Sequence, residues 1–221
     1  MKMRLSLMLA LLPLILVPAG ACGQPYTPPP GEVEATEFLG TELTPISEQG
    51  NNALRGTQYI ERETYQLSVD GLVAKPLNLS YDDLLSYPQE SRLVYMPCVE
   101  GWGFWAKWTG PRLAAIFEDA GVKVETITVI FHCADEEGYT SLELDYILQR
   151  DIIIALKLND VTLPPERGFP FQVVAEDKYG YKWAKWVSGI ELSDEDYHGF
   201  WERAGYNNQA DAGGPAFEPR E

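Results

Sequence analysis

The sequence predicts one mixed α+β domain. Short β-type runs are interrupted by short amphipathic segments, without the regular strand–helix–strand alternation that is typical of parallel α/β proteins. The chain has 221 residues, of which 45% are hydrophobic. Once its polar ends are set aside, this length and composition suit a single ordinary domain with its own core.

The first predicted elements are a strand and a short helix. Apolar side chains alternate at residues 65, 67 and 69, which predicts a strand that ends in a turn at Asp70-Gly71. Ser80 is a suitable N-cap, with Asp83 three residues later. This capping pattern predicts a short helix that runs through Leu85.

The centre of the chain is a β-type run, residues 93–96, that leads into a turn containing Cys98. Pro97 precedes the cysteine, and Gly101 and Gly103 follow it. A strand that ends in a glycine-rich turn can hold one side chain at the mouth of a pocket. A buried cysteine that packs as a small apolar side chain is the equally simple alternative, and these residues alone leave both open.

The remaining elements follow in order. Pro111 suits the first turn of a helix whose apolar face lies at residues 113–116 and which ends at Gly121. Beyond it the pattern predicts a strand at 126–132, a polar loop at 134–139, a helix at 141–148, a strand at 152–158, a turn at 159–160, and strands at 171–174 and 187–192.

The two ends are predicted to lie outside the domain. Residues 1–21 have the basic start and short apolar run of a signal peptide. The small residues before Cys22 fit either ordinary cleavage or a bacterial lipobox, in which Cys22 is lipidated. Residues 22–57 are expected to form an extended, weakly structured tether, residues 58–206 the domain, and residues 207–221 a loose polar tail.

The charge of the chain narrows its possible partners. The formal net charge is -16, with only two histidines and three cysteines. Such a surface repels nucleic acid and anionic lipid headgroups, whereas it attracts a basic electron carrier. No HExxH or CxxC motif is present, so a zinc site is not expected.

Six motifs, in this order and spacing, resemble those of the sulfite-oxidase-like molybdopterin-binding domain. The resemblance extends from about Tyr65 to Tyr206, and it implies a single-domain, mixed-sheet fold of the sulfite-oxidase type. The motifs are Cys98-Val99-Glu100-Gly101-Trp102, Trp108-x-Gly110, Asp135-Glu136-Glu137-Gly138-Tyr139-Thr140, Arg167-Gly168-Phe169-Pro170-Phe171-Gln172, Tyr179-Gly180-Tyr181-Lys182-Trp183-Ala184-Lys185-Trp186 and Phe200-Trp201-x-x-x-Gly205-Tyr206.

The resemblance implies a molybdenum–molybdopterin cofactor and a role for five of these residues. Cys98 would be the thiolate ligand of the metal, and a soft thiolate suits an oxo-metal that cycles by two electrons. Trp102 is expected to wall the pocket. Gly180, Tyr181 and Lys182 would lie against the pterin-phosphate arm, where a lysine beside glycine backbone amides can hold a phosphate.

Two positions depart from the family pattern. Gln172 stands where the family often has arginine, and glutamine lacks the charge and the bidentate fork of that side chain. Arg167 stands where the family often has histidine or asparagine, so the positive charge has moved five residues upstream. Both residues are expected to contact the cofactor.

The implied activity is oxygen-atom transfer by an exported, membrane-anchored enzyme of the cell envelope. Sulfite oxidation requires cations near the metal, and the candidates are Arg112, Arg167 and Lys107. A neutral sulfoxide, either small or protein-bound, fits the acidic surface better, and both reactions stay open. No haem or iron–sulfur motif is present, so a separate electron-transfer protein or quinone system is expected.

A binding module that has lost the cofactor is the alternative hypothesis. This cofactor is made in the cytoplasm, and its enzymes usually leave the cell folded through the twin-arginine route. The start of this chain has Lys2-Met3-Arg4 in place of a twin arginine. Retention of Cys98 within its motif favours the enzyme.

Overall fold

The computed structural model describes residues 26–136 and 138–219. Its larger sheet has five strands in the order β4-β3-β13-β7-β8. Strand β13 lies parallel to β3 and antiparallel to β7, which confirms the predicted mixed sheet. The strands are β3 (Gln66–Gly71), β4 (Leu77–Ser80), β7 (Thr128–Cys133), β8 (Thr140–Glu143) and β13 (Val187–Ser193).

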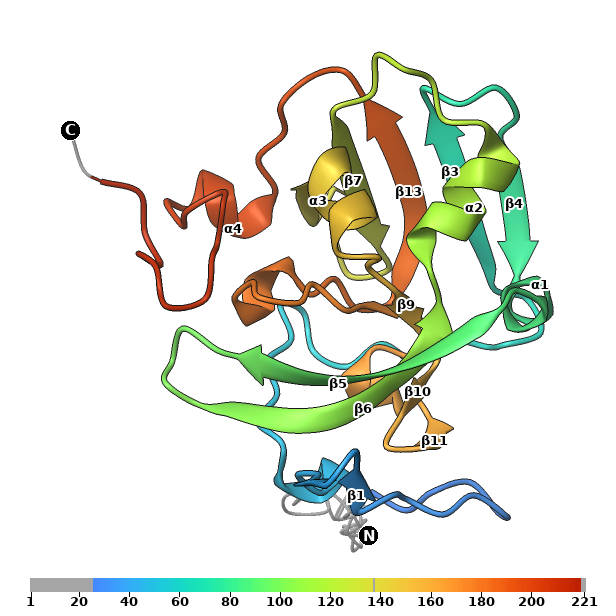
Figure 1. Ribbon diagram of the computed structural model, residues 1–221, viewed down its shortest axis with the longest axis vertical. Coiled ribbons are helices and arrows are strands. Elements are labelled where there is room, and N and C mark those ends of the chain that lie inside the picture. The colour runs from blue at the N-terminus through green and yellow to red at the C-terminus, as the bar shows by residue number, and fades with distance from the viewer. Residues whose placement is uncertain (1–25, 137, 220–221) are drawn as a thin grey trace, which may run out of the picture.

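A long antiparallel hairpin forms most of the second sheet, whose order is β11-β10-β6-β5. Strands β5 (Gln89–Pro97) and β6 (Gly103–Pro111) pair along their whole length and curve beneath the first sheet (Figure 1). Short ladders complete the fold, and they are formed by β1 (Glu37–Phe38), β2 (Thr41–Glu42), β9 (Ile154–Ala155), β10 (Lys157–Leu158), β11 (Val161–Thr162) and β12 (Gln172–Val173).

The helices are short, and α1 begins where its capping residues predict. Helix α1 (Tyr81–Ser86) has the expected capping box between Ser80 and Asp83. Helix α2 (Leu113–Ala120) ends at Gly121, which adopts the left-handed conformation that glycine tolerates. The others are α3 (Leu144–Gln149), α4 (Phe200–Arg203) and the 3-10 turns η1 (Ile46–Glu48), η2 (Pro165–Arg167) and η3 (Gly180–Lys182).

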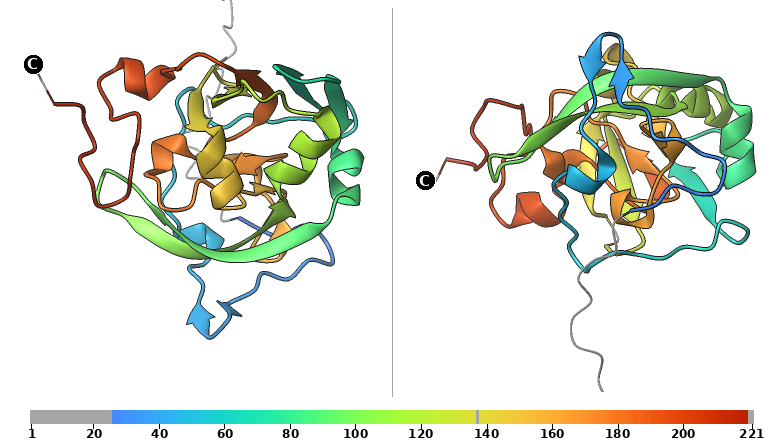
Figure 2. Two further views of the ribbon diagram at one scale, coloured as in Figure 1. Left: turned by 45° about the horizontal axis from the view of Figure 1, so that its top comes forward. Right: turned by 90° about the horizontal axis from the view of Figure 1, so that it is seen from below.

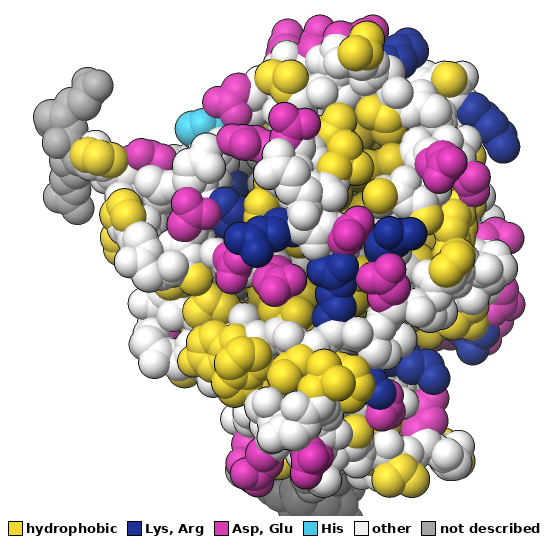
Figure 3. Space-filling view, in the orientation of Figure 1, with side chains coloured by type: hydrophobic (Ala, Val, Ile, Leu, Met, Phe, Trp, Pro, Cys, Tyr) yellow, Lys and Arg dark blue, Asp and Glu magenta, His cyan; other side chains and the backbone are white. Residues whose placement is uncertain are grey.

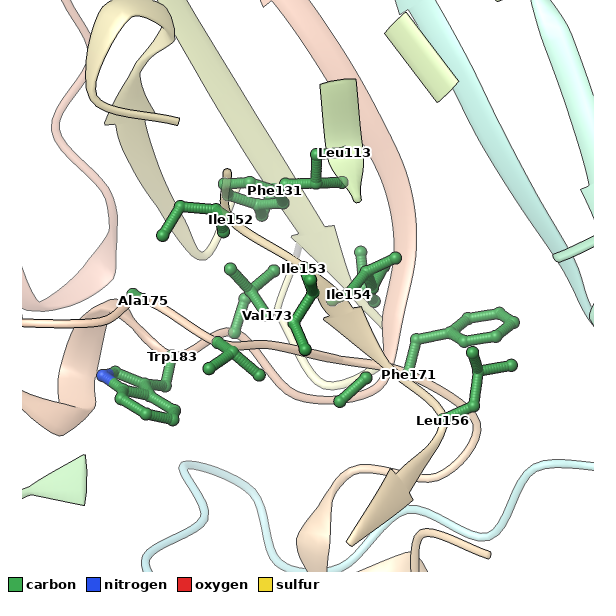
Figure 4. Close-up of a cluster of buried hydrophobic side chains, with 14 of the residues drawn as sticks. Leu113, Phe131, Ile152, Ile153, Ile154, Leu156, Phe171, Val173, Ala175 and Trp183 are labelled. Carbon is green, nitrogen blue, oxygen red and sulfur yellow. The ribbon is translucent and has the colours of Figure 1, made fainter. Parts of the chain in front are cut away.

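The core lies between the two sheets, and residues 152–156 run through its centre (Figure 4). This apolar run was predicted as one strand, but it divides into β9 and β10 because Leu156 leaves one ladder for another. Ala155 pairs with Gln172, whereas Leu156 donates its backbone N–H to Thr109. Gly110 allows this crossing, since a Cβ there would lie 1.9 Å from the carbonyl oxygen of Ile154.

Two predictions of secondary structure were wrong. The helix expected at 141–148 begins at Leu144, because Thr140, Ser141 and Leu142 instead pair with β7 as strand β8. Strand β6 was not predicted, although its buried residues alternate with outward-facing ones at the period of a strand. In both cases pairing with the preceding strand decided the local conformation.

The prediction of a weakly structured tether is wrong for residues 26–57, here called the N-terminal segment. Ile46 is 4% exposed and packs in the core. The carboxylate of Glu32 accepts hydrogen bonds from both the backbone and the hydroxyl of Thr162. Figure 2 shows this segment, in blue, lying against the β5–β6 hairpin. Much of this segment is exposed, but several of its polar groups form hydrogen bonds with the domain, and Ile46 anchors it in the core.

The prediction of a loose tail is also wrong for residues 207–219, here called the C-terminal segment. Ala210 is fully buried, and its carbonyl oxygen accepts the backbone N–H of Tyr179. Asp211 forms an ion pair with Lys178 at 2.6 Å. The predicted signal peptide and Cys22 lie outside the described residues. Within the described ranges, none of the helices is long and apolar enough to cross a membrane.

Substitution of Ile46 tests whether the N-terminal segment belongs to the domain. Ile46→Ala should lower the free energy of unfolding by about 2–5 kcal/mol, because it leaves a cavity in the core. The matched control is Val33→Ala in the same segment, where the side chain is 80% exposed, and a change within about 0.5 kcal/mol is expected. Urea denaturation measures both. Equal, near-neutral effects would show that the segment is a tether after all.

Candidate functional site

Cys98 lies at the tip of the β5–β6 hairpin. The two strands pair as far as Pro97 and Gly103, which leaves a loop of residues 98–102. The backbone N–H of Cys98 donates to the carbonyl of Trp102 at 2.8 Å, and Gly101 donates back to Cys98 at 3.1 Å. Gly101 has φ +89°, a conformation that favours glycine. These bonds fix the direction in which Cys98 leaves the backbone.

Cys98 lines a pocket at the tip of the hairpin. All the residues predicted for the site line this pocket except Lys182. The lining residues are Asn51, Asn52, Met96, Cys98, Val99, Glu100, Trp102, Phe104, Tyr139, Arg167, Gln172, Gly180, Tyr181, Trp183, Lys185, Trp201 and Tyr206.

Without a bound metal, the environment of Cys98 favours its thiol form, because its pKa is raised. Burial raises the pKa of Cys98, and the carboxylate of Glu100 raises it further, whereas the backbone N–H groups of Glu100 and Val99 lower it. Two backbone donors at the sulfur are suited to a charged thiolate, but burial opposes that charge. A metal cation bound to the sulfur would resolve this conflict, because a coordinating thiol is deprotonated.

Gln172, on β12, brings an unpaired polar atom to the pocket. The side chain is 4% exposed, and its Oε1 atom has no hydrogen-bond partner among the described residues. A buried acceptor without a partner costs about 1–3 kcal/mol. The pocket therefore contains a polar group that a bound molecule with N–H groups would satisfy.

Two cations, Arg167 and Lys185, line the same pocket. The guanidinium of Arg167 donates to the carbonyl oxygens of Gly50 and Gln49, both at 2.5 Å. The ammonium of Lys185 lies 2.9 Å from the amide oxygen of Asn51. Within the described part of the chain, neither cation has a carboxylate at ion-pair distance, and both instead contact neutral oxygens.

Burial lowers the pKa values of both cations, and neighbouring carboxylates such as Glu166 offset this only in part. Burial lowers the pKa of Arg167 to about 10. Burial, together with repulsion from Arg167, lowers the pKa of Lys185 to about 7. An anionic group in the pocket would relieve both effects, because it would pair with the charged forms. The donor set thus fits a phosphate.

Lys182 does not lie in the pocket, and the prediction that it holds a phosphate is not supported by its position. Its side chain is 1% exposed, and its ammonium lies 2.5 Å from Oε1 of Glu202. It also donates to the carbonyl of Ser141 and to the amide oxygen of Asn208. These bonds join η3, β8, α4 and the C-terminal segment, so the role of Lys182 is structural.

The residue that takes the expected place of Lys182 is Lys185, three positions later in the same motif. The motif contained both lysines, but nothing in the sequence indicated which of them faces the pocket. Asn51 and Asn52 were also missed, because they lie in a segment that was predicted to be a tether. Their position follows from the bonds that Arg167 and Lys185 make to this segment.

Aromatic rings form the remaining walls. Trp102 packs against Gly50, where a Cβ would lie 2.4 Å from the indole ring. The indole N–H of Trp102 donates to Glu100 at 2.9 Å. On the other side, the ring of Tyr206 lies 5.1 Å from that of Tyr181 and 5.3 Å from that of Trp201. Trp102 thus walls the pocket as predicted, and Trp201 of α4 and Tyr206 form part of the facing wall.

Comparison with known proteins identifies the family. Residues 55–201 match the family model described as the oxidoreductase molybdopterin binding domain. The chain belongs to this family. It is therefore a molybdopterin-dependent oxidoreductase, with molybdenum–molybdopterin as its cofactor. The unpaired amide of Gln172, the cations and the thiol of Cys98 all fit that group.

Three matches illustrate the range of relatives. The uncharacterized oxidoreductase YuiH of Bacillus subtilis (strain 168) is 39% identical, over 69% of this chain and 77% of YuiH. The putative protein-methionine-sulfoxide reductase subunit YedZ1 of Azospira oryzae is 30% identical, over 67% of this chain and 56% of that protein. The protein-methionine-sulfoxide reductase catalytic subunit MsrP of Campylobacter jejuni is 27% identical, over 71% of this chain and 58% of MsrP.

A solved structure supports the fold. The sulfane dehydrogenase SoxCD of Paracoccus pantotrophus superposes with a TM-score of 0.66 at 24% identity, over 69% of this chain and 44% of that chain. This confirms the predicted mixed-sheet fold of the sulfite-oxidase type. The chain spans little more than half the length of the sulfoxide reductase relatives, and less than half of the SoxCD chain.

The structural role of Lys182 gives a test. Lys182→Met should lower the free energy of unfolding by about 3–5 kcal/mol, because it leaves the buried Glu202 carboxylate unpaired. Lys182→Met/Glu202→Leu should recover most of this loss. The control is Arg62→Met, which removes an exposed ion pair with Asp82 and should cost no more than about 1 kcal/mol. Denaturant unfolding measures all three. A stable Lys182→Met protein that has lost its cofactor would restore the original prediction.

Proposed function

We propose that this protein catalyses oxygen-atom transfer at a molybdenum whose protein ligand is the thiolate of Cys98. The observation that carries the proposal is the position of this thiol, which lies on the pocket beside Gln172 and the two cations. Cys133, the other cysteine in the described residues, is 5% exposed in the core strand β7. A soft sulfur ligand suits a metal that exchanges oxo groups and changes by two electrons.

The cofactor, when bound, supplies the two-electron redox chemistry and the exchange of an oxygen atom. The chain supplies ligands and orientation. Cys98 holds the metal, and the backbone N–H groups of Val99 and Glu100 stabilise the charge on its sulfur. The amide of Gln172 is available to the polar edge of the pterin, and Arg167 and Lys185 to its phosphate.

A neutral sulfoxide is the substrate class that the pocket favours. Lys107 and Arg112 were candidate cations, but Lys107 pairs with Asp160, and Arg112 pairs with Glu90 and Asp151. Neither lines the pocket. If the cofactor's phosphate pairs with the two cations of the pocket, the remaining part of the pocket rim is aromatic and carries Glu100. Two relatives, YedZ1 and MsrP, are named as protein-methionine-sulfoxide reductase subunits.

Sulfite-type oxidation is the second candidate, and the presence of two cations in the pocket favours it. Arg167 and Lys185 would attract an anionic substrate if the phosphate lay elsewhere. The same protein preparation can be assayed for both reactions, so one set of variants distinguishes the two. The alternative of a module without cofactor is less consistent with the unpaired amide of Gln172 and with the uncompensated cations.

Location and partners extend the proposal. The signal peptide at 1–21 and the small residues before Cys22 support export and lipid anchoring at the cell envelope. In the residues that the structure describes, no cluster of histidine, cysteine and acidic side chains is available to hold a second metal. Electrons would therefore be exchanged with a separate protein or a quinone system.

The role of Cys98 is tested by its replacement with serine. Cys98→Ser should reduce dye-linked turnover by more than about 100-fold and change the molybdenum signal in electron paramagnetic resonance, because an oxygen ligand is harder than a thiolate. Reduction of methionine sulfoxide and oxidation of sulfite should both be measured. The control is Cys133→Ser, which should lower thermal stability while leaving the metal spectrum unchanged. Parental turnover and an unchanged spectrum in Cys98→Ser would refute the assignment.

Cofactor retention tests the role of Lys185. Lys185→Ala should weaken binding about 10- to 100-fold, the equivalent of one charge-assisted hydrogen bond. Molybdenum content after prolonged dialysis measures this directly. Lys178→Ala is the control, because Lys178 pairs with Asp211 and does not line the pocket. Equal molybdenum content in the two variants would mean that Lys185 does not hold the cofactor.

A further inference from the structure

The outward face of the β5–β6 hairpin carries two large aromatic side chains that the core does not use. Tyr95 and Trp105 are directly paired across the two strands, with ring centroids 5.3 Å apart. They are 41% and 43% exposed, whereas their neighbours Met96 and Phe104 are buried on the opposite face. Burial in the fold therefore explains the inner residues of the hairpin but not this outer pair.

The N-terminal segment extends the apolar surface. The backbone N–H of Thr44 donates to the carbonyl of Trp105, which holds this segment beside β6. The ring of Phe38 lies over the ammonium of Lys107, and Leu39 is 78% exposed in the adjoining turn. Figure 3 shows hydrophobic side chains gathered over the hairpin. Exposed patches of this kind, rimmed by polar residues, often mark interaction sites.

Acidic side chains flank this surface. Glu37 and Glu42 pair across the β1–β2 turn, and Glu100 lies in the loop at the hairpin tip. Two lysines lie on this side of the sheet. Lys107 pairs with Asp160 at 2.6 Å, and Lys157 lies opposite Thr109 on the neighbouring strand β10. The chain as a whole has a formal net charge of -16. A partner that approaches this face would meet a negative potential, so a basic partner is favoured.

The outer aromatic pair is also close to the proposed metal ligand along the chain. Cys98 follows Tyr95 by three residues, which corresponds to about 10 Å of extended strand. Electron transfer slows steeply with distance, so a redox partner must bind near the pocket. The hairpin face meets this requirement, because its aromatic pair and Cys98 belong to the same hairpin.

We propose that the hairpin face, defined by Tyr95, Trp105 and Phe38, is the docking surface of a basic electron-transfer protein. This inference rests on the proposed function. Tyr and Trp are the side chains that most often anchor interfaces, and an acidic rim accelerates association with a basic partner. Small interfaces of this composition suit the transient complexes of electron transfer.

Transfer of electrons to two acceptors tests the proposal. The holoenzyme is reduced with dithionite, desalted, and mixed with an oxidised basic c-type cytochrome or with a small soluble quinone. Tyr95→Ser/Trp105→Ser should lower the second-order rate constant with the cytochrome by about tenfold or more, because two anchor residues are lost. The rate with the quinone should stay within about twofold, since the pocket is unchanged.

Two further variants control the experiment. Val124→Ser/Ile127→Ser removes exposed apolar side chains from the loop that leads from α2 into β7, and it should leave both rates unchanged. Glu37→Gln/Glu42→Gln should slow the reaction with the cytochrome and weaken its dependence on salt. A parental rate with the cytochrome in Tyr95→Ser/Trp105→Ser would overturn the docking site.

Failure of the proposed function gives a different result. If the parent neither reduces methionine sulfoxide nor oxidises sulfite, that function fails, and calorimetry with the oxidised cytochrome then tests docking alone. Weaker binding by Tyr95→Ser/Trp105→Ser supports the site, and equal binding overturns it. Sedimentation with phosphatidylcholine vesicles examines a membrane contact. Vesicle binding that is lost in Tyr95→Ser/Trp105→Ser, without any change in cytochrome binding, would also overturn the proposal.

Discussion

The hydrogen bonds that Arg167 makes to the N-terminal segment are the interaction on which the pocket depends. Its guanidinium donates to the carbonyl oxygens of Ile46, Gln49 and Gly50. These bonds place Asn51 and Asn52 on the pocket, and they place Gly50 under the ring of Trp102. A buried cation that is paired only with neutral oxygens retains unused electrostatic attraction, which an anionic ligand can satisfy. Arg167 therefore holds the N-terminal segment against the pocket and also supplies a positive charge to which an anion could bind.

The opposite wall depends on a second buried cation, Lys182, which is paired with a carboxylate rather than with neutral oxygens. Lys182 is paired with the Glu202 carboxylate, which also accepts the hydroxyl of Thr140 at 2.6 Å. This pair holds α4 and the C-terminal segment, so that Trp201 and Tyr206 face the hairpin tip across the pocket. The contrast between the two cations is informative. Compensation by a carboxylate marks Lys182 as structural, whereas Arg167 and Lys185, which have no carboxylate at ion-pair distance, define the side of the pocket where we propose that an anion binds.

The sequence predicted local features well where a single side chain decides them. The capping box at Ser80, the helix end at Gly121 and the turn that presents Cys98 all follow from residues close to one another in the chain. Strand β8 depends on pairing with the preceding strand β7, and the division of residues 152–158 depends on pairing with the more distant β6 and β12, none of which local patterns reveal. The direction of Lys182 was unpredictable for the same reason, because Glu202 lies twenty positions away in another element.

The polar composition of the chain ends was the main source of error, and its physical cause bears on function. Segments rich in Pro, Gly and Glu usually stay unfolded because they bury too little apolar surface. Here the domain supplies backbone and side-chain partners for those polar groups, and a few buried residues such as Leu43, Ile46 and Ala210 anchor them. The family match covers residues 55–201, yet Asn51, Asn52 and Tyr206 line the pocket from outside that range. The domain that the family shares thus provides the thiol and the cations, while segments beyond it complete the walls that a substrate meets.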